Sequence, residues 1–375
     1  MNVLCLDQFS ELGGAQRCLL DLLPALADRG WRAHVAAPGE GELFPRAAAL
    51  GATTDRIRCG PYSSGRKSLA DMARFAWDMP RLAGQIRALI RRHAADLIYV
   101  NGPRLLPAVA LAARRGPPVL FHAHSLLEGH AGRVAGRSLG MARAALVASC
   151  RFVATPLRRY CGERGVRVVY NGVRPARPAD RARAPGVQRR IGVIGRISPE
   201  KGQADFLRAA RVLYGGFPGC RFVVCGAPLF SDPVAMRYRA VLDALSENLP
   251  VEFTGWTENV EDTLATLDLL VVPSAPVDAT PRVILEAFAA SVPVLAFASG
   301  GIPEIVAHNA TGVLVEERSP EALAAAMRGL LGAPDRMREV AEGALAKVRC
   351  EFHLERYQQE MLAAMESSVS SYHSR

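Results

Sequence analysis

The sequence of 375 residues predicts an α/β protein with two Rossmann-like domains, each built on a doubly wound parallel sheet. Three observations support this fold class. Short apolar runs alternate with amphipathic stretches of helical period, which is typical of parallel β-α-β units. The chain is long for one hydrophobic core, and its hydrophobic fraction of 50% is enough for two packed sheets. A segment rich in proline, alanine and arginine, 174–186, separates two such alternating halves.

The first half contains a glycine turn and a strand that ends in two histidines. Its expected strands are 3–6, 33–36, 97–100 and 119–122. The turn Gly13-Gly14-Ala15-Gln16-Arg17 follows the first of them and leads into a helix. His122 and His124 close the fourth and face one side of it, because they are two residues apart. One histidine is usually a hydrogen-bonded core side chain, whereas two at the carboxyl end of a strand favour a ligand site.

The second half opens with a cluster that suits a diphosphate. Its expected strands are 191–194, 221–225, 251–254, 269–272 and 294–297. The first strand is followed by Gly195-Arg196-Ile-Ser-Pro-Glu-Lys201-Gly202 and a helix at 203–213. A glycine turn, two cations and the free N–H groups of a helix N-terminus bind diphosphate without a metal. The alternative is an ordinary strand–loop–helix corner with two surface cations.

Two carboxylates follow the fourth strand of this half, in Asp278-Ala279-Thr280-Pro281-Arg-Val-Ile-Leu-Glu286. Pro281 suits the first turn of a helix. Asp278 then lies in the preceding loop and Glu286 about one and a half turns inside the helix. Both can point toward the helix N-terminus, beyond the carboxyl end of a strand. Taken alone, the pair fits a helix cap and a solvated glutamate, and the Gly195–Gly202 cluster is what favours a ligand site.

With these motifs in this order, the sequence resembles the family-4 glycosyltransferases over almost its whole length. These are retaining enzymes of the GT-B architecture, whose two Rossmann-like domains face a central cleft. The paired-acid motif of the family, two acids separated by seven residues, matches Asp278 and Glu286, with Asp where Glu is usual. The donor-phosphate Arg and Lys of the family match Arg196 and Lys201.

The resemblance extends to four further segments. The N-terminal glycine loop of the family matches Gly13 and Gly14, and its interdomain Asn-Gly-Val matches Asn171-Gly172-Val173. The turn that borders the nucleotide base resembles Thr254-Gly255-Trp256. The family histidine that helps to position the sugar matches His124. The chain departs from the family at Ala279-Thr280-Pro281, where Gly-Phe-Gly is common, because Pro281 cannot donate an N–H group to the sugar.

The resemblance implies a role for each of these residues. The catalytic residues would be His124, Arg196, Lys201, Asp278 and Glu286. The donor-binding residues would be Gly13, Gly14, Gly195, Gly255, Trp256, Ala279, Thr280, Pro281 and Glu286, with sugar or acceptor contacts from His122 and Asn171. Residues 1–180, joined by a crossover helix within 351–375, would bind the acceptor, and residues 187–350 would bind the nucleotide-sugar donor.

No D-x-D sequence occurs in the chain, so we expect no metal and no cofactor beyond the nucleotide-diphosphate sugar substrate. Three alternatives stay open: a nucleotide-sugar epimerase, a phosphorylase, or a binding protein without catalysis on the same scaffold. The last would more often have lost Arg196, Lys201 or Glu286. A nicotinamide dehydrogenase is disfavoured, because no G-x-G-x-x-G follows a strand.

Charge is unevenly distributed and bears on the acceptor. Residues 1–180 hold 26 Lys and Arg against 13 Asp and Glu, whereas residues 181–375 hold 20 against 23. Basic stretches with apolar faces, 66–77 and 81–92, suit an anionic membrane or an acidic acceptor, although they can also be solvated helix faces. We therefore expect a saccharide, lipid-linked or small-molecule acceptor, for example in envelope polysaccharide or glycoconjugate synthesis, and no nucleic acid.

Scattered cysteines, no apparent signal peptide and no membrane-spanning run predict a cytoplasmic protein, with peripheral contact on the inner face of the plasma membrane as one option.

Overall fold

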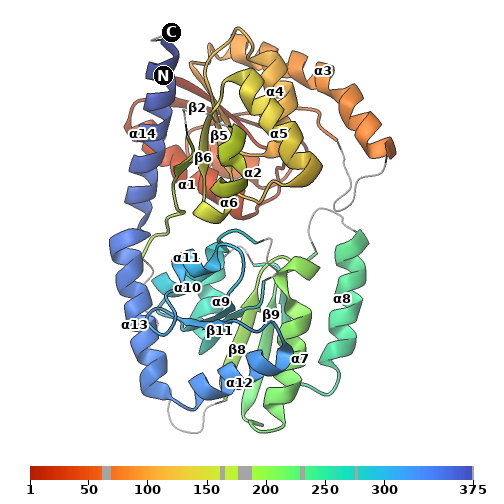
Figure 1. Cartoon of the computed structure of the whole chain (residues 1–375), viewed down its shortest axis with the longest axis vertical. Helices are drawn as coiled ribbons and strands as arrows, with labels where there is room; N and C mark the ends of the chain where they lie inside the picture. The colour runs from red at the N-terminus through yellow and green to blue at the C-terminus, as the bar shows by residue number, and fades with distance from the viewer. Residues whose placement is uncertain are drawn as a thin grey trace. The chain divides into compact units, whose positions relative to one another are not determined.

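The chain forms two compact units. The computed structural model describes residues 1–60, 69–160, 165–175, 188–228, 233–257, 259–274 and 278–373. Unit 1 consists of Met1–Asn171 together with Leu354–Arg375, and unit 2 consists of Gly172–His353 (Figure 1). Most of the predicted linker and the start of the first basic stretch, Arg66 included, lie outside the described residues.

Unit 1 is built on a parallel sheet with the strand order β3-β2-β1-β4-β5-β6-β7. Its strands are β1 (Asn2–Leu6), β2 (Arg32–Ala37), β3 (Thr53–Arg56), β4 (Leu97–Val100), β5 (Val119–Ala123), β6 (Ala145–Ala148) and β7 (Arg167–Val168). Four of them were predicted from their apolar runs. Sequence analysis did not name β3, which is polar and largely exposed, β6, an apolar run of four residues, or β7, which has only two.

The helices of unit 1 include the last helix of the chain. They are α1 (Gly14–Asp28), α2 (Leu43–Ala49), α3 (Leu69–Arg92), α4 (Leu106–Ala112), α5 (Gly129–Ala142), α6 (Arg151–Leu157) and α14 (Leu354–His373), with 3-10 turns at Pro103–Leu105 and Arg158–Tyr160. Helix α14, blue in Figure 1, packs its buried Tyr357 and Met361 into the same core as Leu19 and Leu22 of α1. Burial of these side chains stabilises the packing of α14 on unit 1.

Unit 2 repeats the architecture with the strand order β10-β9-β8-β11-β12-β13. Its strands are β8 (Arg189–Ile194), β9 (Cys220–Cys225), β10 (Val251–Gly255), β11 (Leu269–Val272), β12 (Val294–Phe297) and β13 (Val313–Val315). Its helices are α7 (Gln203–Tyr214), α8 (Pro233–Ser246), α9 (Val260–Thr266), α10 (Arg282–Ala289), α11 (Ile302–Ile305), α12 (Pro320–Leu331) and α13 (Pro334–Glu351), with a 3-10 turn at Pro199–Lys201. The strand that sequence analysis missed, β13, has only three residues.

Each sheet has one point at which the strand order reverses. In unit 1 this switch point lies between β1 and β4, and in unit 2 between β8 and β11. The loops after the two neighbouring strands diverge there, so open α/β sheets bind ligands beyond these carboxyl ends. The fold thus brings together the loops that follow β1 and β4, and likewise the loops that follow β8 and β11.

No helix in the described part of the chain is both long enough and apolar enough to cross a bilayer.

Candidate functional site

The two charged motifs of unit 2 meet at its switch point. Lys201 ends the 3-10 turn after β8, and Asp278 lies in the loop after β11. The Lys201 Nζ atom is 2.6 Å from Oδ2 of Asp278, and the two side chains are 25% and 15% exposed. Both predicted motifs therefore belong to one site, although the paired residues are 77 positions apart in the sequence.

A glycine makes this approach possible. Gly202 has a φ of +69°, and a Cβ atom there would lie 1.9 Å from the carbonyl oxygen of Pro273, at the exit of β11. Only glycine fits this close contact in the left-handed region. Helix α7 begins at the next residue, Gln203, so its free N–H groups lie next to Lys201.

Arg196 lies in the same loop and pairs with Glu200. The carbonyl group of Arg196 accepts a hydrogen bond of 2.8 Å from Nε2 of Gln203, which ties the loop to the first turn of α7. The Arg196 and Glu200 side chains are 34% and 37% exposed. Ion pairs this open to solvent contribute little, so the guanidinium group can exchange this partner for a phosphate at small cost.

Glu286 lies inside α10 and is held by an arginine of the same helix. Its Oε1 atom is 2.9 Å from Nε of Arg282, and both side chains are 15% exposed. Pro281 is the N-cap of α10 and not its first helical residue, because its ψ of 116° is not helical. Next to it, the hydroxyl of Thr280 is buried and has no hydrogen-bond partner among the described residues. Ala279 is buried as well.

A second glycine turn, which sequence analysis missed, contacts the first acid. The Gly301 N–H group donates to the carbonyl oxygen of Asp278 at 3.2 Å. The Ser299 hydroxyl donates to the carbonyl oxygen of Ser274 at 2.7 Å. The available signal was Ser299-Gly-Gly301, which directly follows the predicted strand 294–297.

The predicted base-binding turn follows β10. Gly255 has a φ of +72°, and its carbonyl oxygen accepts from the Gly226 N–H group at 2.8 Å. The Trp256 side chain is 40% exposed, so its indole ring is available for stacking. Gly195, at the end of β8, donates its N–H group to the carbonyl oxygen of Cys225 at 2.9 Å. The turns after β8, β9 and β10 are thereby joined.

In unit 1, the glycine turn is connected to a buried carboxylate. The Gly13 N–H group donates to Oε1 of Gln16 at 3.0 Å, and Nε2 of Gln16 donates to Oδ1 of Asp7 at 2.7 Å. Gly14 begins α1. Asp7 directly follows β1 and is completely buried, and this burial raises its pKa from 3.8 to about 6.

The predicted histidines lie at the carboxyl end of β5, in different environments. His124 is partly exposed, and its Nε2 atom is 2.8 Å from Oδ1 of Asn101, which follows β4. Burial lowers the pKa of His124 to about 4, so its imidazole is neutral at physiological pH. His122 has no exposed surface, and its ring centroid lies 3.9 Å from that of His124. Its Nδ1 atom is 2.7 Å from the Tyr99 hydroxyl. His122 is therefore not itself accessible and lies behind the ring of His124.

Asn171 is buried and fixed to two helices of unit 1. Its Oδ1 atom accepts from the Cys18 thiol of α1 at 3.2 Å, and its carbonyl oxygen accepts from Nη2 of Arg356 in α14 at 3.2 Å. These contacts hold the end of unit 1 in place.

Sequence analysis also missed Asp7, Asn101 and Tyr99. The signal for the first two was a polar residue directly after an apolar strand, at 3–6 and at 97–100.

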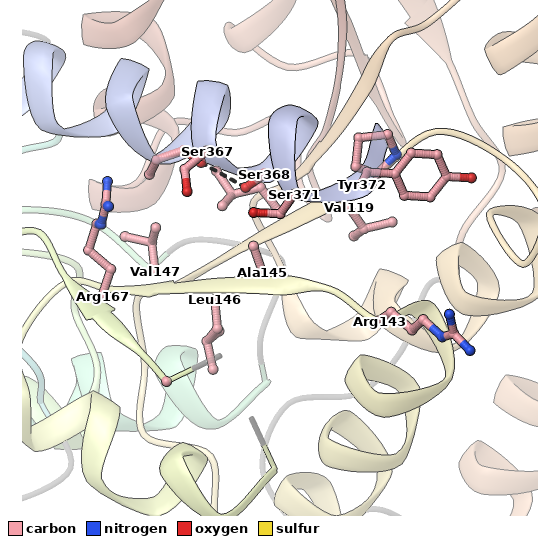
Figure 2. Close-up of a pocket in the computed structure, with 14 residues that line it drawn as sticks. Val119, Arg143, Ala145, Leu146, Val147, Arg167, Ser367, Ser368, Ser371 and Tyr372 are labelled. Carbon is pink, nitrogen blue, oxygen red and sulfur yellow. Dashed lines mark hydrogen bonds between the residues drawn. The ribbon is translucent and has the colours of Figure 1, made fainter. Parts of the chain in front are cut away.

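A cavity of about 560 Å³ lies in unit 1 where strands β5, β6 and β7 begin, away from the carboxyl ends that carry the predicted site residues (Figure 2). It is lined by Val119, Ala145 and Arg167, which begin β5, β6 and β7, and by Ser367 and Ser371 of α14. None of the predicted site residues lines it, because they follow the carboxyl ends of the strands. No group of three metal-ligating side chains occurs within the described ranges.

Comparisons with known proteins identify the family of the chain. The sequence profile described as Glycosyltransferase Family 4 matches residues 12–177, and the one described as Glycosyl transferases group 1 matches residues 188–333. D-inositol 3-phosphate glycosyltransferase 1 of Catenulispora acidiphila is 31% identical over 303 residues, 71% of this chain and 72% of that enzyme. The D-inositol 3-phosphate glycosyltransferase of Segniliparus rotundus is 31% identical over 182 residues. That match spans 45% of this chain and only 39% of that enzyme.

Solved structures share the GT-B fold over the whole chain. Anabaena HepE, in complex with UDP and glucose, has a TM-score of 0.81 at 25% identity and covers 98% of this chain and 100% of that one. Sucrose-phosphate synthase from Thermosynechococcus elongatus has a TM-score of 0.79 at 19% identity, with coverage of 99% and 100%.

Proposed function

Because the chain belongs to glycosyltransferase family 4, we propose that it moves a sugar from a nucleotide-diphosphate sugar to an acceptor, with retention of the anomeric configuration. The observation that carries the proposal is the contact between Lys201 and Asp278 at the switch point of unit 2. It joins a cation suited to the leaving diphosphate with a carboxylate suited to sugar hydroxyls, beside the N-terminus of α7.

The proposed chemistry follows from the charges that develop in the reaction. Breaking the sugar–phosphate bond produces positive charge at the anomeric carbon and negative charge on the diphosphate. Arg196, Lys201 and the free N–H groups of α7 stabilise the leaving group. Glu286 accepts hydrogen bonds from the ribose hydroxyls, and Asp278 contacts the sugar. The leaving phosphate takes the proton of the acceptor.

Unit 1 contributes to the sugar and acceptor in this proposal. By resemblance, His124 positions the transferred sugar and the Gly13–Gly14 turn lies at the diphosphate. Gly14, at the start of α1, offers its N–H group there, because that of Gly13 is bonded to Gln16. We assign no proton transfer to His124.

The acceptor in this proposal is a saccharide or lipid-linked saccharide at an anionic surface. The first turns of α3 are largely exposed and carry Met72 and Trp77, which are 39% and 71% exposed. Residues 1–180 also hold twice as many basic as acidic side chains, 26 against 13. Basic amphipathic helices of this kind bind anionic lipid reversibly.

A thermal-shift screen with UDP-, GDP-, ADP- and TDP-sugars tests the donor. HepE was solved with UDP-glucose, so this sugar nucleotide is tested first. A ligand at about 100 times its Kd stabilises the folded state by about 2.7 kcal/mol, a readily measured shift. The Lys201→Ala variant is the control and should lose the shift.

The product then tests the reaction. Once the donor is identified, NMR spectra of the product give the coupling constant of its anomeric proton. This coupling should indicate the same anomeric configuration as in the donor. An inverted product, or no response to any nucleotide sugar, would contradict the proposal.

A further inference from the structure

The glycine turn and His124 are connected through one buried carboxylate. Asp7 lies at the end of β1 with no exposed surface. Its Oδ1 atom accepts from the Phe9 N–H group at 3.0 Å and from Nε2 of Gln16 at 2.7 Å, and its Oδ2 atom accepts from Nδ2 of Asn101 at 2.6 Å. A buried carboxylate is costly even when it is fully hydrogen-bonded. An apolar or amide side chain would fill this position at lower cost, which points to a role beyond packing.

These contacts determine how the amide of Asn101 is oriented. Its Nδ2 group donates one hydrogen to Asp7 and the other to the carbonyl oxygen of Ala15, at 3.0 Å. Both partners are acceptors only, so the nitrogen must lie on this side of the amide. The Oδ1 atom therefore faces the other way, toward His124 and the Tyr99 hydroxyl.

The orientation of Asn101 in turn fixes the proton of His124. An amide oxygen only accepts, so the Nε2 atom of His124, 2.8 Å away, must carry the hydrogen. The neutral ring then has an unprotonated Nδ1 atom. In the described part of the chain Nδ1 has no hydrogen-bond partner, and the side chain is partly exposed. An acceptor is thus presented at the carboxyl end of β5.

We propose that Asp7 is a positioning residue, which acts through Asn101 to keep the proton of His124 on Nε2 and so presents Nδ1 as an acceptor for a sugar hydroxyl. Through Gln16, the same carboxylate holds the N–H group of Gly13. The inference rests on the proposed function only for the identity of the hydroxyl, because the tautomer of His124 exists without substrate.

The Asp7→Asn variant separates this role from simple packing. The substitution keeps the size of the side chain but leaves only one oxygen. That oxygen stays on the side of Phe9 and Gln16, which supply two donors, and the new NH₂ group faces Asn101. The Asn101 amide then turns over, at the cost of its hydrogen bond to the carbonyl oxygen of Ala15, and presents its own NH₂ group to His124. The proton of His124 moves to Nδ1.

A double variant restores the wild-type arrangement. In Asp7→Asn combined with Asn101→Asp, the carboxylate at position 101 accepts from the new amide at position 7 on one side and from Nε2–H of His124 on the other. The Asp7 and Asn101 side chains are simply exchanged, so net charge is unchanged. The hydrogen bond to Ala15 is lost, which lowers stability but not the tautomer preference.

The test is the tautomer of His124, measured by NMR on full-length protein with ¹⁵N-labelled histidine. The chain has 8 histidines, and the His124→Gln variant assigns the signal. We expect Nε2–H in the wild type, Nδ1–H in Asp7→Asn, and Nε2–H again in the double variant. Transfer should fall about tenfold in Asp7→Asn, as for one misplaced hydrogen bond, and recover in the double variant.

The Gln16→Met variant is the matched control, because it removes the Gln16 side-chain hydrogen bond to Asp7 and leaves Asn101 in place. It should leave the tautomer of His124 unchanged. A wild-type proton on Nδ1 would overturn the inference without any variant. An unchanged tautomer in folded Asp7→Asn, or an equal change in Gln16→Met, would do the same. Absence of transfer by the wild type would instead contradict the proposed function and leave the tautomer result intact.

Discussion

At the scale of single residues, both candidate phosphate-binding cations already have carboxylate partners. Lys201 pairs with Asp278, and Arg196 pairs with Glu200. These pairs hold the cations in place before any ligand binds, so little reorganisation is needed when a diphosphate arrives. Preorganisation of this kind makes each cation important for the rate and unimportant for the fold.

We expect Lys201→Ala and Arg196→Ala each to lower the turnover number about 100-fold or more, because each removes a positive charge aimed at the leaving group. Steady-state kinetics with a nucleotide-sugar donor is the measurement. Arg208→Ala is the matched control, since Arg208 lies on α7 with an exposed partner, Asp205, and should change the rate little. Near-normal rates in both Lys201→Ala and Arg196→Ala would contradict the assignment of these residues to the donor diphosphate.

The buried carboxylate predicts that activity and the contribution of Asp7 to stability move in opposite directions as the pH falls. The pKa of Asp7 is raised from 3.8 to about 6 by burial. The folded protein therefore takes up this proton near pH 6, and the unfolded chain only near pH 4. Between these values the contribution of Asp7 to stability rises as the pH falls, by about 3 kcal/mol in all. Over the same range a protonated Asp7 loses an acceptor for Asn101 or Gln16, so transfer should decline.

In the folded protein no other titratable group of this network takes up a proton near pH 6. Burial raises the pKa of Cys5 to about 12 and that of Tyr99 well above 10, and the pKa of His124 is about 4. Burial lowers the pKa of His122 and His124, so these histidines are protonated in the unfolded chain below about pH 6.5 and their own contribution to stability falls with the pH. The Asp7 contribution is therefore read from the difference between the wild type and Asp7→Asn. We expect the pH–rate profile to show an acidic limb near pH 6 that is absent in Asp7→Asn. Urea denaturation of the wild type and of Asp7→Asn from pH 4 to pH 8 measures how the free energy of unfolding depends on Asp7. If the rate of Asp7→Asn falls near pH 6 in the same way, the fall belongs to another titratable group.

At the scale of elements, α3 is packed over only part of its length. Met79, Leu82 and Ile86 are buried, whereas most side chains of the turns before them are exposed. Trp77 lies in these turns, with the guanidinium group of Arg81 5.9 Å from its ring centroid. An exposed tryptophan with a neighbouring arginine is typical of a helix that lies at a membrane interface.

We expect Trp77→Ser to weaken sedimentation with anionic vesicles at low salt, because the apolar contact is lost. Binding of the wild type should also fall at high salt, since each basic residue near the surface contributes about 1 kcal/mol. Met236→Ser, at a 61% exposed position of α8 in unit 2, is the control. Equal and negligible binding of the wild type to anionic and neutral vesicles would end the membrane proposal and leave the transferase proposal standing.

Helix α14 is required for the stability of unit 1. Tyr357 is 1% exposed and donates its hydroxyl hydrogen to the carbonyl oxygen of Cys18 at 3.0 Å. Tyr357→Ala should lower the free energy of unfolding by about 3–5 kcal/mol, the usual loss for a buried aromatic side chain. Tyr372→Ala, on the same helix but 47% exposed, should cost much less. Denaturation followed by circular dichroism distinguishes the two, and equal losses would contradict the packing of α14 against unit 1.

At the scale of the whole molecule, the absence of D-x-D from the sequence predicts how the leaving group is neutralised. With no such metal-binding pair, we expect fixed cations to carry the charge. We expect transfer to survive dialysis against EDTA with most of its rate. Strict dependence on added Mg²⁺ or Mn²⁺ would contradict this prediction.

Much of the fold and part of the site were predictable because their signals are local. Apolar runs such as 97–100 and 269–272 are buried strands, and the turns at Gly13 and Gly202 begin helices where expected. Two of the four missed strands lack that signal, since β7 has two residues and β3 is polar. The other two, β6 and β13, are apolar runs of four and three residues that sequence analysis did not name. Asp7 and Asn101 were missed because each is an isolated polar residue whose partner is 94 positions away.

By itself, the sequence determined the fold class, the glycine turns and the chemical groups at the strand ends, because periodicity and turn chemistry act over a few residues. Only the tertiary structure decided which of these groups meet. The register of β1 and β4 pairs Leu6 with Val100, so the next residues, Asp7 and Asn101, become neighbours. The order β8-β11 does the same for Lys201 and Asp278. Strand order is a property of packing across the whole sheet, which no local pattern specifies.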